Sequence, residues 1–209
     1  MLPFPHNSIK LNDSKTLKYI QTGNIPFFLN FSQRMDVNKY YSSIKNFTFQ
    51  DIANLNVICR PGIFETSFEN YINRRNFRKT ESVISEITEF TKNSAGIVLY
   101  RQQLEQIIQA ITKCSDEEAI YFRKKMGTRN KLAELKPDFI KRTREIEYTN
   151  KTPEELFEMI LEYSVYAFDY NYAYAKSLQI YFHAYIRANF TDYNFESYTL
   201  KVISMSVIS

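Results

Sequence analysis

Apolar residues recur at intervals of three and four along most of the chain, and no long stretch alternates between apolar and polar positions. The first spacing is that of one buried face of an α-helix, whereas a half-buried strand would alternate at every second residue. The chain has only four glycines, which leaves few positions for the tight turns of a β protein. The pattern therefore predicts an all-α, multi-helix protein.

Polar residues ahead of the apolar runs predict where several helices begin. SDEE at 115–118 and TPEE at 152–155 both match a capping box, and the second also has a proline at the first helical position. TFQD at 48–51 has the same spacing. A shorter helix should be capped near Asp13 and end at Gly23. Further apolar stripes with helical spacing lie at 67–76, 80–93 and 100–113.

The chain shows no internal repeat and no low-complexity linker. With 209 residues, 44% of them apolar and 24% charged, it has the composition of a globular protein with its own core. Residues 1–209 are therefore predicted to form a single compact domain, with the polar stretch 145–153 as its hinge. GIVLY at 96–100 suits either a short strand or the entry to a helix.

The cysteines and the two ends of the sequence bear on location. Cys59 and Cys114 each lie within an apolar helical pattern, which favours free buried thiols in a reducing compartment over a disulfide. The start, MLPFPHNSIK, has no basic region leading into an apolar run, and the apolar tail VISMSVIS is too short to cross a bilayer. We expect a cytoplasmic protein with no membrane partner.

Positive charge is concentrated rather than spread evenly. The net charge is +4, but residues 123–144 contain nine basic side chains and two acidic ones. A smaller basic cluster lies at 74–79. Contact with a polyanion needs such blocks, because each neutralised phosphate releases counterions. A solvated helix face explains the same charges, so both interpretations stay open.

No pattern of catalytic or metal-binding residues is visible. The histidines His6 and His183 have no neighbouring cysteine or histidine in the sequence, and Asp-x-Asp does not occur. Gly96 and Gly127 are isolated, and no phosphate-cradling GxxxxGK[ST] motif is present. The sequence predicts no catalytic residue, no metal and no cofactor.

Several segments, taken in order, are similar to a known family. The most specific are RPG at 60–62, GIVLYRQQ at 96–103 and RKKMG at 123–127. Their order and spacing resemble the fingers region of the alpha subunit of bacterial DNA polymerase III, the C-family replicative polymerase, over about residues 11–190. The resemblance implies an all-α fingers fold.

The departures from this family are as informative. In the family the catalytic aspartates belong to the palm, upstream of the matched region, so we expect this chain to lack the palm. The family loop YGFNKSH, which meets the nucleotide's triphosphate, is matched here by YAFDYNY at 166–172. Asp169 stands for the asparagine, Tyr170 for the lysine and Tyr172 for the histidine. A carboxylate beside phenols is a poor partner for a triphosphate, so the resemblance implies a non-catalytic protein whose nucleotide site is lost.

The resemblance also bears on where nucleic acid would bind. It places the 74–79 group near the family's nucleic-acid and nucleotide channel, and RKKMG at 123–127 matches the family's basic run Arg-Arg-Ala-Met-Gly. We expect both groups to contact phosphate. The 74–79 group comprises Arg74, Arg75, Arg78 and Lys79. The 123–131 group comprises Arg123, Lys124, Lys125, Arg129 and Lys131.

Tyrosines are dense near the end of the chain. Those from Tyr163 to Tyr185 fall roughly on one face if a single helix runs through them. One interpretation is a core-facing stripe with its phenols tipped toward water. The other is a platform for stacking single-stranded bases or a partner's side chains, with Tyr166, Tyr170 and Tyr174 as the candidates.

These observations lead to one main hypothesis and two alternatives. The main hypothesis is a stand-alone fingers-like protein, in the manner of a mobile-element product, that binds DNA or a replisome protein by mimicry and modulates or inhibits replication. The alternatives are a non-catalytic piece of a split DNA polymerase and a plain, sequence-independent DNA-binding module. The lost lysine and histidine of the loop disfavour the split polymerase.

Overall fold

A computed structural model describes residues 9–23, 37–60, 64–79, 87–144 and 151–190. Within these ranges every regular element is a helix, apart from one isolated parallel β-bridge between Tyr100 and Phe168. The predicted all-α class is confirmed. None of the helices in the described ranges is long and apolar enough to cross a bilayer.

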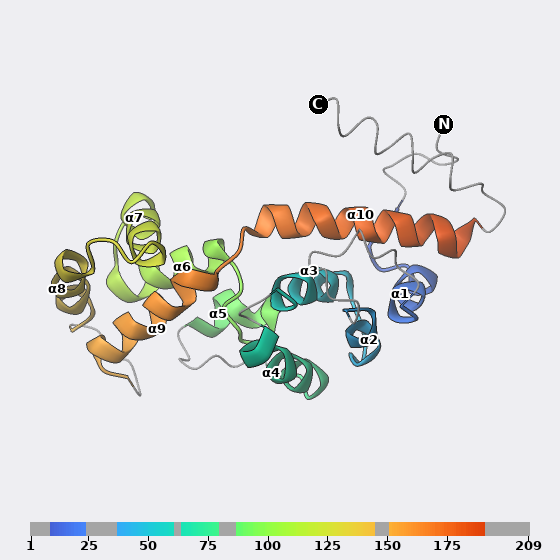
Figure 1. Cartoon of the computed structure of the whole chain (residues 1–209), viewed down its shortest axis with the longest axis horizontal. Coiled ribbons are helices and arrows are strands. Elements are labelled where there is room, and N and C mark those ends of the chain that lie inside the picture. The colour runs from blue at the N-terminus through green and yellow to red at the C-terminus, as the bar shows by residue number, and fades with distance from the viewer. Residues whose placement is uncertain (1–8, 24–36, 61–63, 80–86, 145–150, 191–209) are drawn as a thin grey trace, which may run out of the picture.

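Figure 1 shows the arrangement of the helices. They are α1 (Ser14–Gln21), α2 (Val37–Ser42), α3 (Phe49–Ile58), α4 (Phe64–Asn76), α5 (Thr88–Thr91), the 3-10 helix η4 (Lys92–Ser94), α6 (Arg101–Thr112), α7 (Asp116–Gly127), α8 (Leu132–Thr143), α9 (Pro153–Tyr166) and α10 (Tyr170–Asn189).

Two hydrophobic clusters organise these helices into two lobes. In the first lobe, α10 lies along α1 and α3, and Ile52, Leu55 and Tyr181 are fully buried between them (Figure 1). In the second lobe, α6 to α9 pack together around residues such as Leu104 and Phe157. Each large side chain buried in this way contributes about 1.5–3 kcal/mol, so both lobes have a substantial core.

The helix starts form as their sequences predict. The Ser115 hydroxyl accepts a hydrogen bond from the Glu118 N–H at 3.3 Å, and the Glu118 carboxylate accepts one from the Ser115 N–H at 2.9 Å. The box at 152–155 is closed in the same way, at 3.2 and 2.7 Å. Asp51 accepts from the Thr48 N–H at 2.8 Å. The predicted capping boxes are therefore confirmed, as is the short helix capped by Asp13.

One glycine sets how closely two helices of the second lobe approach. A Cβ atom built on Gly127, the last residue of α7, would lie 2.9 Å from the backbone oxygen of Ser164 in α9. Real Cβ contacts essentially never come so close, so any side chain here would push α7 away from α9.

The tyrosine-rich stretch does not form one continuous helix. Helix α9 ends at Tyr166 and α10 begins at Tyr170, because the backbone between them turns aside to pair with the start of α6. The Phe168 N–H donates to the Leu99 carbonyl at 2.9 Å, and the Arg101 N–H donates to the Phe168 carbonyl at 2.8 Å. A single tyrosine face from 163 to 185 is therefore ruled out, and GIVLY contributes one bridge residue rather than a strand.

Other predictions meet the structure only in part. Cys59 is buried at the end of α3 and Cys114 is half-buried after α6, and both are free thiols as predicted. In the apolar stripe at 80–93, the described residues form α5 and the start of η4, and residues 80–86 lie outside the described residues. The predicted hinge at 145–153 also lies mostly outside them, and the single-domain assignment stays a prediction.

Candidate nucleic-acid interface

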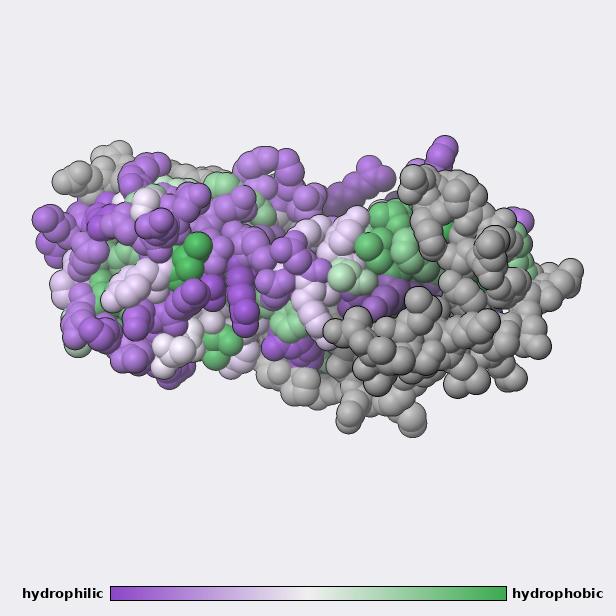
Figure 2. All heavy atoms as spheres, turned by 90° about the horizontal axis from the view of Figure 1, so that it is seen from above, coloured by the Kyte–Doolittle hydropathy of each residue, from purple (hydrophilic) through white to green (hydrophobic). Residues whose placement is uncertain are grey.

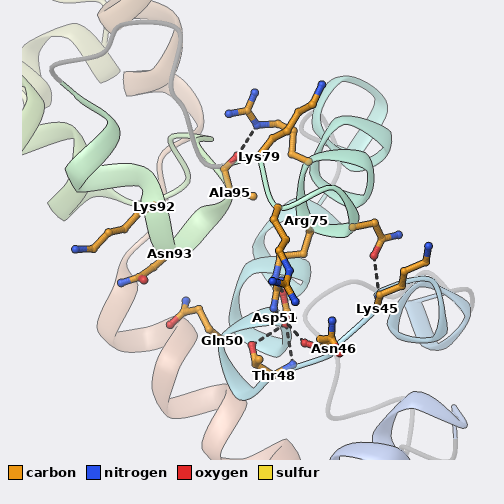
Figure 3. A pocket seen from close by; sticks show the side chains of 13 residues that line it. Lys45, Asn46, Thr48, Gln50, Asp51, Arg75, Lys79, Lys92, Asn93 and Ala95 are labelled. Atoms are coloured by element: carbon orange, nitrogen blue, oxygen red, sulfur yellow. Dashed lines mark hydrogen bonds and ion pairs between the residues drawn. The ribbon is translucent and has the colours of Figure 1, made fainter.

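A basic pocket of about 420 Å³ opens between α3, α4 and η4 in the first lobe (Figure 3). The start of α3 forms its floor, the end of α4 forms one wall, and η4 forms the other. Its lining residues are Lys45, Asn46, Thr48, Gln50, Asp51, Arg74, Arg75, Asn76, Arg78, Lys79, Lys92, Asn93 and Ala95. Six of these side chains are cationic and one is anionic, so we call this cavity the basic pocket. It contains the entire predicted 74–79 group.

The one carboxylate among the described residues that line the basic pocket is already neutralised. Asp51 is only 1% exposed and forms a two-pronged ion pair with Arg75, at 2.7 Å to Nε and 3.0 Å to Nη2 (Figure 3). The hydroxyl of the buried Tyr71 donates to the same carboxylate at 2.7 Å. Burial and the negative charge of Asp51 together raise the pKa of Tyr71, so its phenol stays protonated as a donor. Arg75 therefore fixes the floor of the pocket and offers little free charge to a ligand.

A second arginine of the group has a similar supporting role. The Arg74 Nε donates a hydrogen bond to the Ala95 carbonyl, which ties the end of α4 to the segment after η4 (Figure 3). Lys92 on the opposite wall pairs with Glu89 on the exposed surface. Such exposed pairs contribute little and exchange readily with solvent, so Lys92 keeps its charge available.

The remaining cations of the pocket face solvent. Lys45, Arg78 and Lys79 are exposed, and none of them forms an ion pair with any residue in the described ranges. The structure thus separates the predicted group into two supporting arginines and two exposed cations. It also adds Lys45 and Lys92, which the sequence analysis missed because they lie about thirty residues before and fifteen after their pocket neighbours.

Backbone geometry at the end of α4 explains how Arg78 reaches the pocket. The Lys79 N–H donates to the Arg74 carbonyl at 2.8 Å, and the Arg78 N–H donates to the Arg75 carbonyl at 3.4 Å. These bonds define a Schellman motif, which needs a left-handed residue and usually has glycine there. Arg78 takes that position with a φ of 53°. The left-handed conformation destabilises a residue other than glycine by about 1–2 kcal/mol, so Arg78 lowers the stability of the fold at this position.

The 123–131 group is arranged differently. Arg123 is 14% exposed and its Nε lies 2.6 Å from a carboxylate oxygen of Glu105 in α6. Lys125 lies over the Tyr121 ring at 5.6 Å, and Lys131 lies 3.2 Å from Glu134. Only Lys124 and Arg129 are exposed cations of this group without an ion pair to a described residue.

Acidic residues from other parts of the chain offset more of the positive block at 123–144. Arg142 pairs with Glu118 of α7 at 2.8 Å, and Lys136 pairs with Glu158 of α9 at 2.6 Å. Hydrophilic residues cover most of the second lobe on the face that Figure 2 shows, with apolar residues only in isolated spots. Four of the nine basic side chains of this block, Arg123, Lys131, Lys136 and Arg142, are thus paired with carboxylates.

The candidate tyrosines divide between surface and core. Tyr166, at the end of α9, is 45% exposed. The Tyr170 ring packs edge-on against the buried Tyr100 at 5.0 Å, and the Tyr174 ring packs edge-on against Phe49 at 5.2 Å. Tyr170 and Tyr174 thus contribute to the first lobe's core, and of the three candidates Tyr166 has the most exposed ring.

The loop that the resemblance singled out has a structural role here. The Asp169 carboxylate caps α10 by accepting from the Tyr172 N–H at 2.9 Å, and it also accepts from the Gln102 amide at 3.3 Å. The bond from Tyr172 is the largest of the effects that hold the pKa of Asp169 below its usual range. Tyr170 and Asp169 are both engaged with neighbours and present no cation to a phosphate.

A metal centre is not found in the part of the chain that the structure describes, where no three His, Cys, Asp or Glu side chains gather closely enough to hold an ion. His183 is buried in α10, where burial and the nearby charge of Arg187 lower its pKa to about 4. A neutral, buried imidazole of this kind is a core residue.

Comparison with known proteins identifies what the chain resembles. The model of the bacterial DNA polymerase III alpha subunit finger domain matches residues 3–147. The DNA polymerase III subunit alpha of Campylobacter jejuni is 28% identical over 186 residues, covering 86% of this chain and 15% of that protein. Those of Borreliella burgdorferi and Staphylococcus aureus are 24% and 25% identical, covering 91% and 93% of this chain. The chain spans less than a fifth of the length of these relatives, at 17% and 18% for the last two.

Proposed function

This chain belongs to the finger-domain family of the bacterial DNA polymerase III alpha subunit, and from that premise we propose that its basic pocket binds the phosphate backbone of DNA. The observation that carries the proposal is the charge balance of the pocket, where six cations surround one carboxylate that is already paired. Phosphate contacts position a protein on nucleic acid without reading its bases. Binding is therefore expected to be independent of base sequence.

The pocket walls support backbone contacts in particular. Lys45, Arg78 and Lys79 are long exposed cations at the rim, while Asn46 and Asn93 bring amide groups to the same cavity. Cations and amides are the side chains that contact phosphate and sugar in protein–DNA complexes. None of the lining residues that the structure describes is aromatic, which favours contact with phosphates over stacking with bases.

The proposed role is non-catalytic. It is supported by the loop at 166–172, where Tyr170 is packed on the core and Asp169 is committed to capping α10, so neither stands ready to bind a triphosphate. The proposal extends to replication: a chain of this family that binds DNA through the fingers surface would compete with the polymerase for DNA or for a replisome protein. A piece of a split polymerase is the alternative, and a purified palm-containing chain restoring primer extension would favour it.

Fluorescence anisotropy with two labelled DNA duplexes of unrelated sequence tests the proposal. The triple variant Lys45→Gln, Arg78→Gln, Lys79→Gln should bind both duplexes about 10- to 100-fold more weakly and lower the salt slope by up to about 3, because three phosphate contacts are lost. The matched control is Lys15→Gln, Lys18→Gln, Lys113→Gln, which removes the same charge from exposed positions elsewhere.

The control should retain wild-type affinity. Equal losses in the two triple variants would mean that net charge alone governs binding, and the pocket would then have no special role. A strong preference for one duplex would contradict the backbone-only mode.

A further inference from the structure

The outer side of α8 carries a groove in which cations flank apolar side chains. The groove has a volume of about 450 Å³, and its described lining residues are Ala133, Lys136, Pro137, Ile140, Lys141 and Arg144. They lie three and four residues apart, so they share one face of the helix, opposite to the side that buries Leu135 and Phe139. None of the described lining residues is acidic. We call this surface the α8 groove.

Helix α9 carries a groove of the opposite charge. Its volume is about 530 Å³, and its described lining residues are Lys151, Glu154, Glu155, Glu158, Met159, Glu162 and Tyr163. All four glutamates are exposed, whereas Met159 and Tyr163 are half-buried and pack on the core of the second lobe. This surface, which we call the α9 groove, is therefore acidic with an apolar floor.

Much of the charge in the two grooves is not balanced within the described part of the chain. One ion pair joins the two sets of lining residues, from the Lys136 Nζ to a carboxylate oxygen of Glu158 at 2.6 Å. Four further exposed charges have no ion pair within the described ranges, namely Lys141, Arg144, Glu154 and Glu162. Each groove thus presents two available charges, positive on α8 and negative on α9.

The charged rows of the two grooves have the same length. Lys136 and Arg144 are eight residues apart in α8, as are Glu154 and Glu162 in α9. At a rise of about 1.5 Å per residue, each row is about 12 Å long. One row can therefore lie along the other, with opposite charges at both ends and apolar side chains between them. The Lys136 ion pair does not prevent this, because an exposed pair exchanges partners at little cost.

We propose that the α8 groove of one copy of this chain docks on the α9 groove of a second copy. A second copy offers each groove a surface of opposite charge, matching length and apolar centre. Both helices lie at the end of the molecule away from α1 and α2 (Figure 1), and neither groove shares a described lining residue with the basic pocket. The self-association is therefore independent of DNA binding at that pocket.

The size of the contact sets its strength. With 12 and 14 residues, α8 and α9 are about 18 and 21 Å long and about 10 Å wide. A contact between two such helices covers much less than the roughly 800 Å² per partner of a standard interface. The association is therefore expected to be weak and reversible.

Sedimentation equilibrium of the full chain tests the proposal. At low salt the mass should rise above that of one chain as the protein concentration increases, and added salt should reverse the rise because it screens exposed charges. The double variants Lys141→Glu, Arg144→Glu and Glu154→Lys, Glu162→Lys replace attractive contacts by repulsive ones. Each should associate at least about ten-fold more weakly.

A mixture of the two double variants separates loss of contact from loss of fold. The α8 groove of the second variant is still basic and the α9 groove of the first is still acidic, and the two reversed grooves also complement each other. An equimolar mixture should therefore recover the association of the wild type. A variant that had failed to fold would not be rescued in this way.

The matched control is Lys15→Glu, Lys18→Glu, which reverses two exposed charges on α1 and should associate as the wild type does. The pocket variant Lys45→Gln, Arg78→Gln, Lys79→Gln should do the same, so failure of self-association is distinguishable from failure of DNA binding. The proposal would be overturned by a wild-type mass of one chain at every concentration, by a mixture that stays dissociated, or by an equal loss in the α1 control.

Discussion

The 74–79 group, which lies in the basic pocket, and the 123–131 group are both basic runs in the sequence, yet they differ in how their charge is balanced. Each contains arginine and lysine at the end of a helix, and each helix closes with a Schellman motif that has arginine at the left-handed position, Arg78 in one and Arg129 in the other. In the basic pocket, the one carboxylate among the described lining residues is buried and paired. In the second region, Glu105 of α6 pairs with the principal arginine. The comparison teaches that the charge available to a ligand depends on acids brought from elsewhere in the fold.

The largest expected effect comes from breaking the ion pair beneath the pocket. Asp51→Ala should lower the free energy of unfolding by about 3–5 kcal/mol, because Arg75 and the Tyr71 hydroxyl would lose a buried acceptor. Glu105→Gln breaks the corresponding pair in the second region. Glu105 is 23% exposed, against 1% for Asp51, and glutamine keeps an oxygen that can accept a hydrogen bond from Arg123, so this change should cost only about 1 kcal/mol.

Urea unfolding of both variants measures this difference. If Glu105→Gln proved as destabilising as Asp51→Ala, the two regions would be built on equally buried pairs, and the contrast between them would disappear.

A smaller effect should come from replacing the left-handed arginines. Arg78→Gly and Arg129→Gly should each raise the free energy of unfolding by about 0.5–1 kcal/mol. Glycine adopts the left-handed conformation without strain, and the larger backbone entropy of glycine in the unfolded chain offsets part of this stabilisation. Thermal unfolding checks the stability, and anisotropy checks DNA affinity. Only Arg78→Gly should weaken DNA binding, so the pair separates stability from function at two matched positions. Loss of affinity in both variants would show that both regions contact DNA.

The smallest effect is expected from the basic run on α7. Replacing Arg123, Lys124 and Lys125 by alanine removes three charges, but Arg123 is paired with Glu105 and Lys125 lies over Tyr121. The salt slope of DNA binding should therefore fall by less than 1, because Lys124 is the one exposed cation of the three and its region is not expected to contact DNA. A fall near 3 in the same titration would restore the sequence-based view that all three residues contact phosphate.

Much of the helical framework could be predicted from the sequence, because a capping box or a proline at the start of a helix acts over three or four residues. The boxes at 48–51, 115–118 and 152–155 all form. The break between α9 and α10 could not be predicted by that means, since it depends on Phe168 pairing with a segment nearly seventy residues earlier. The tyrosine spacing alone therefore indicated a continuous face that the fold interrupts.

The candidate site was predicted only in part, because contacts between distant segments of the chain decide which of its cations are available. Adjacent cations such as Arg74 and Arg75 stood out in the sequence, but nothing local indicated that both would be held by acceptors from other segments, Ala95 and Asp51. Lys45 and Lys92 joined the pocket only through the packing of α3 against α4 and η4. Likewise, Glu105 was not adjacent to the basic run that it partly neutralises.

The paired backbone at Phe168 has a mechanical consequence. Its two hydrogen bonds, to Leu99 and from Arg101, attach the segment between α9 and α10 to the start of α6. We call this pairing the seam, because it connects a helix of the second lobe with the segment that leads into α10 of the first. Each of these hydrogen bonds contributes about 1 kcal/mol net, so opening the seam costs little free energy. The exchange rates of the Phe168 and Arg101 amide protons would therefore report how often this seam opens.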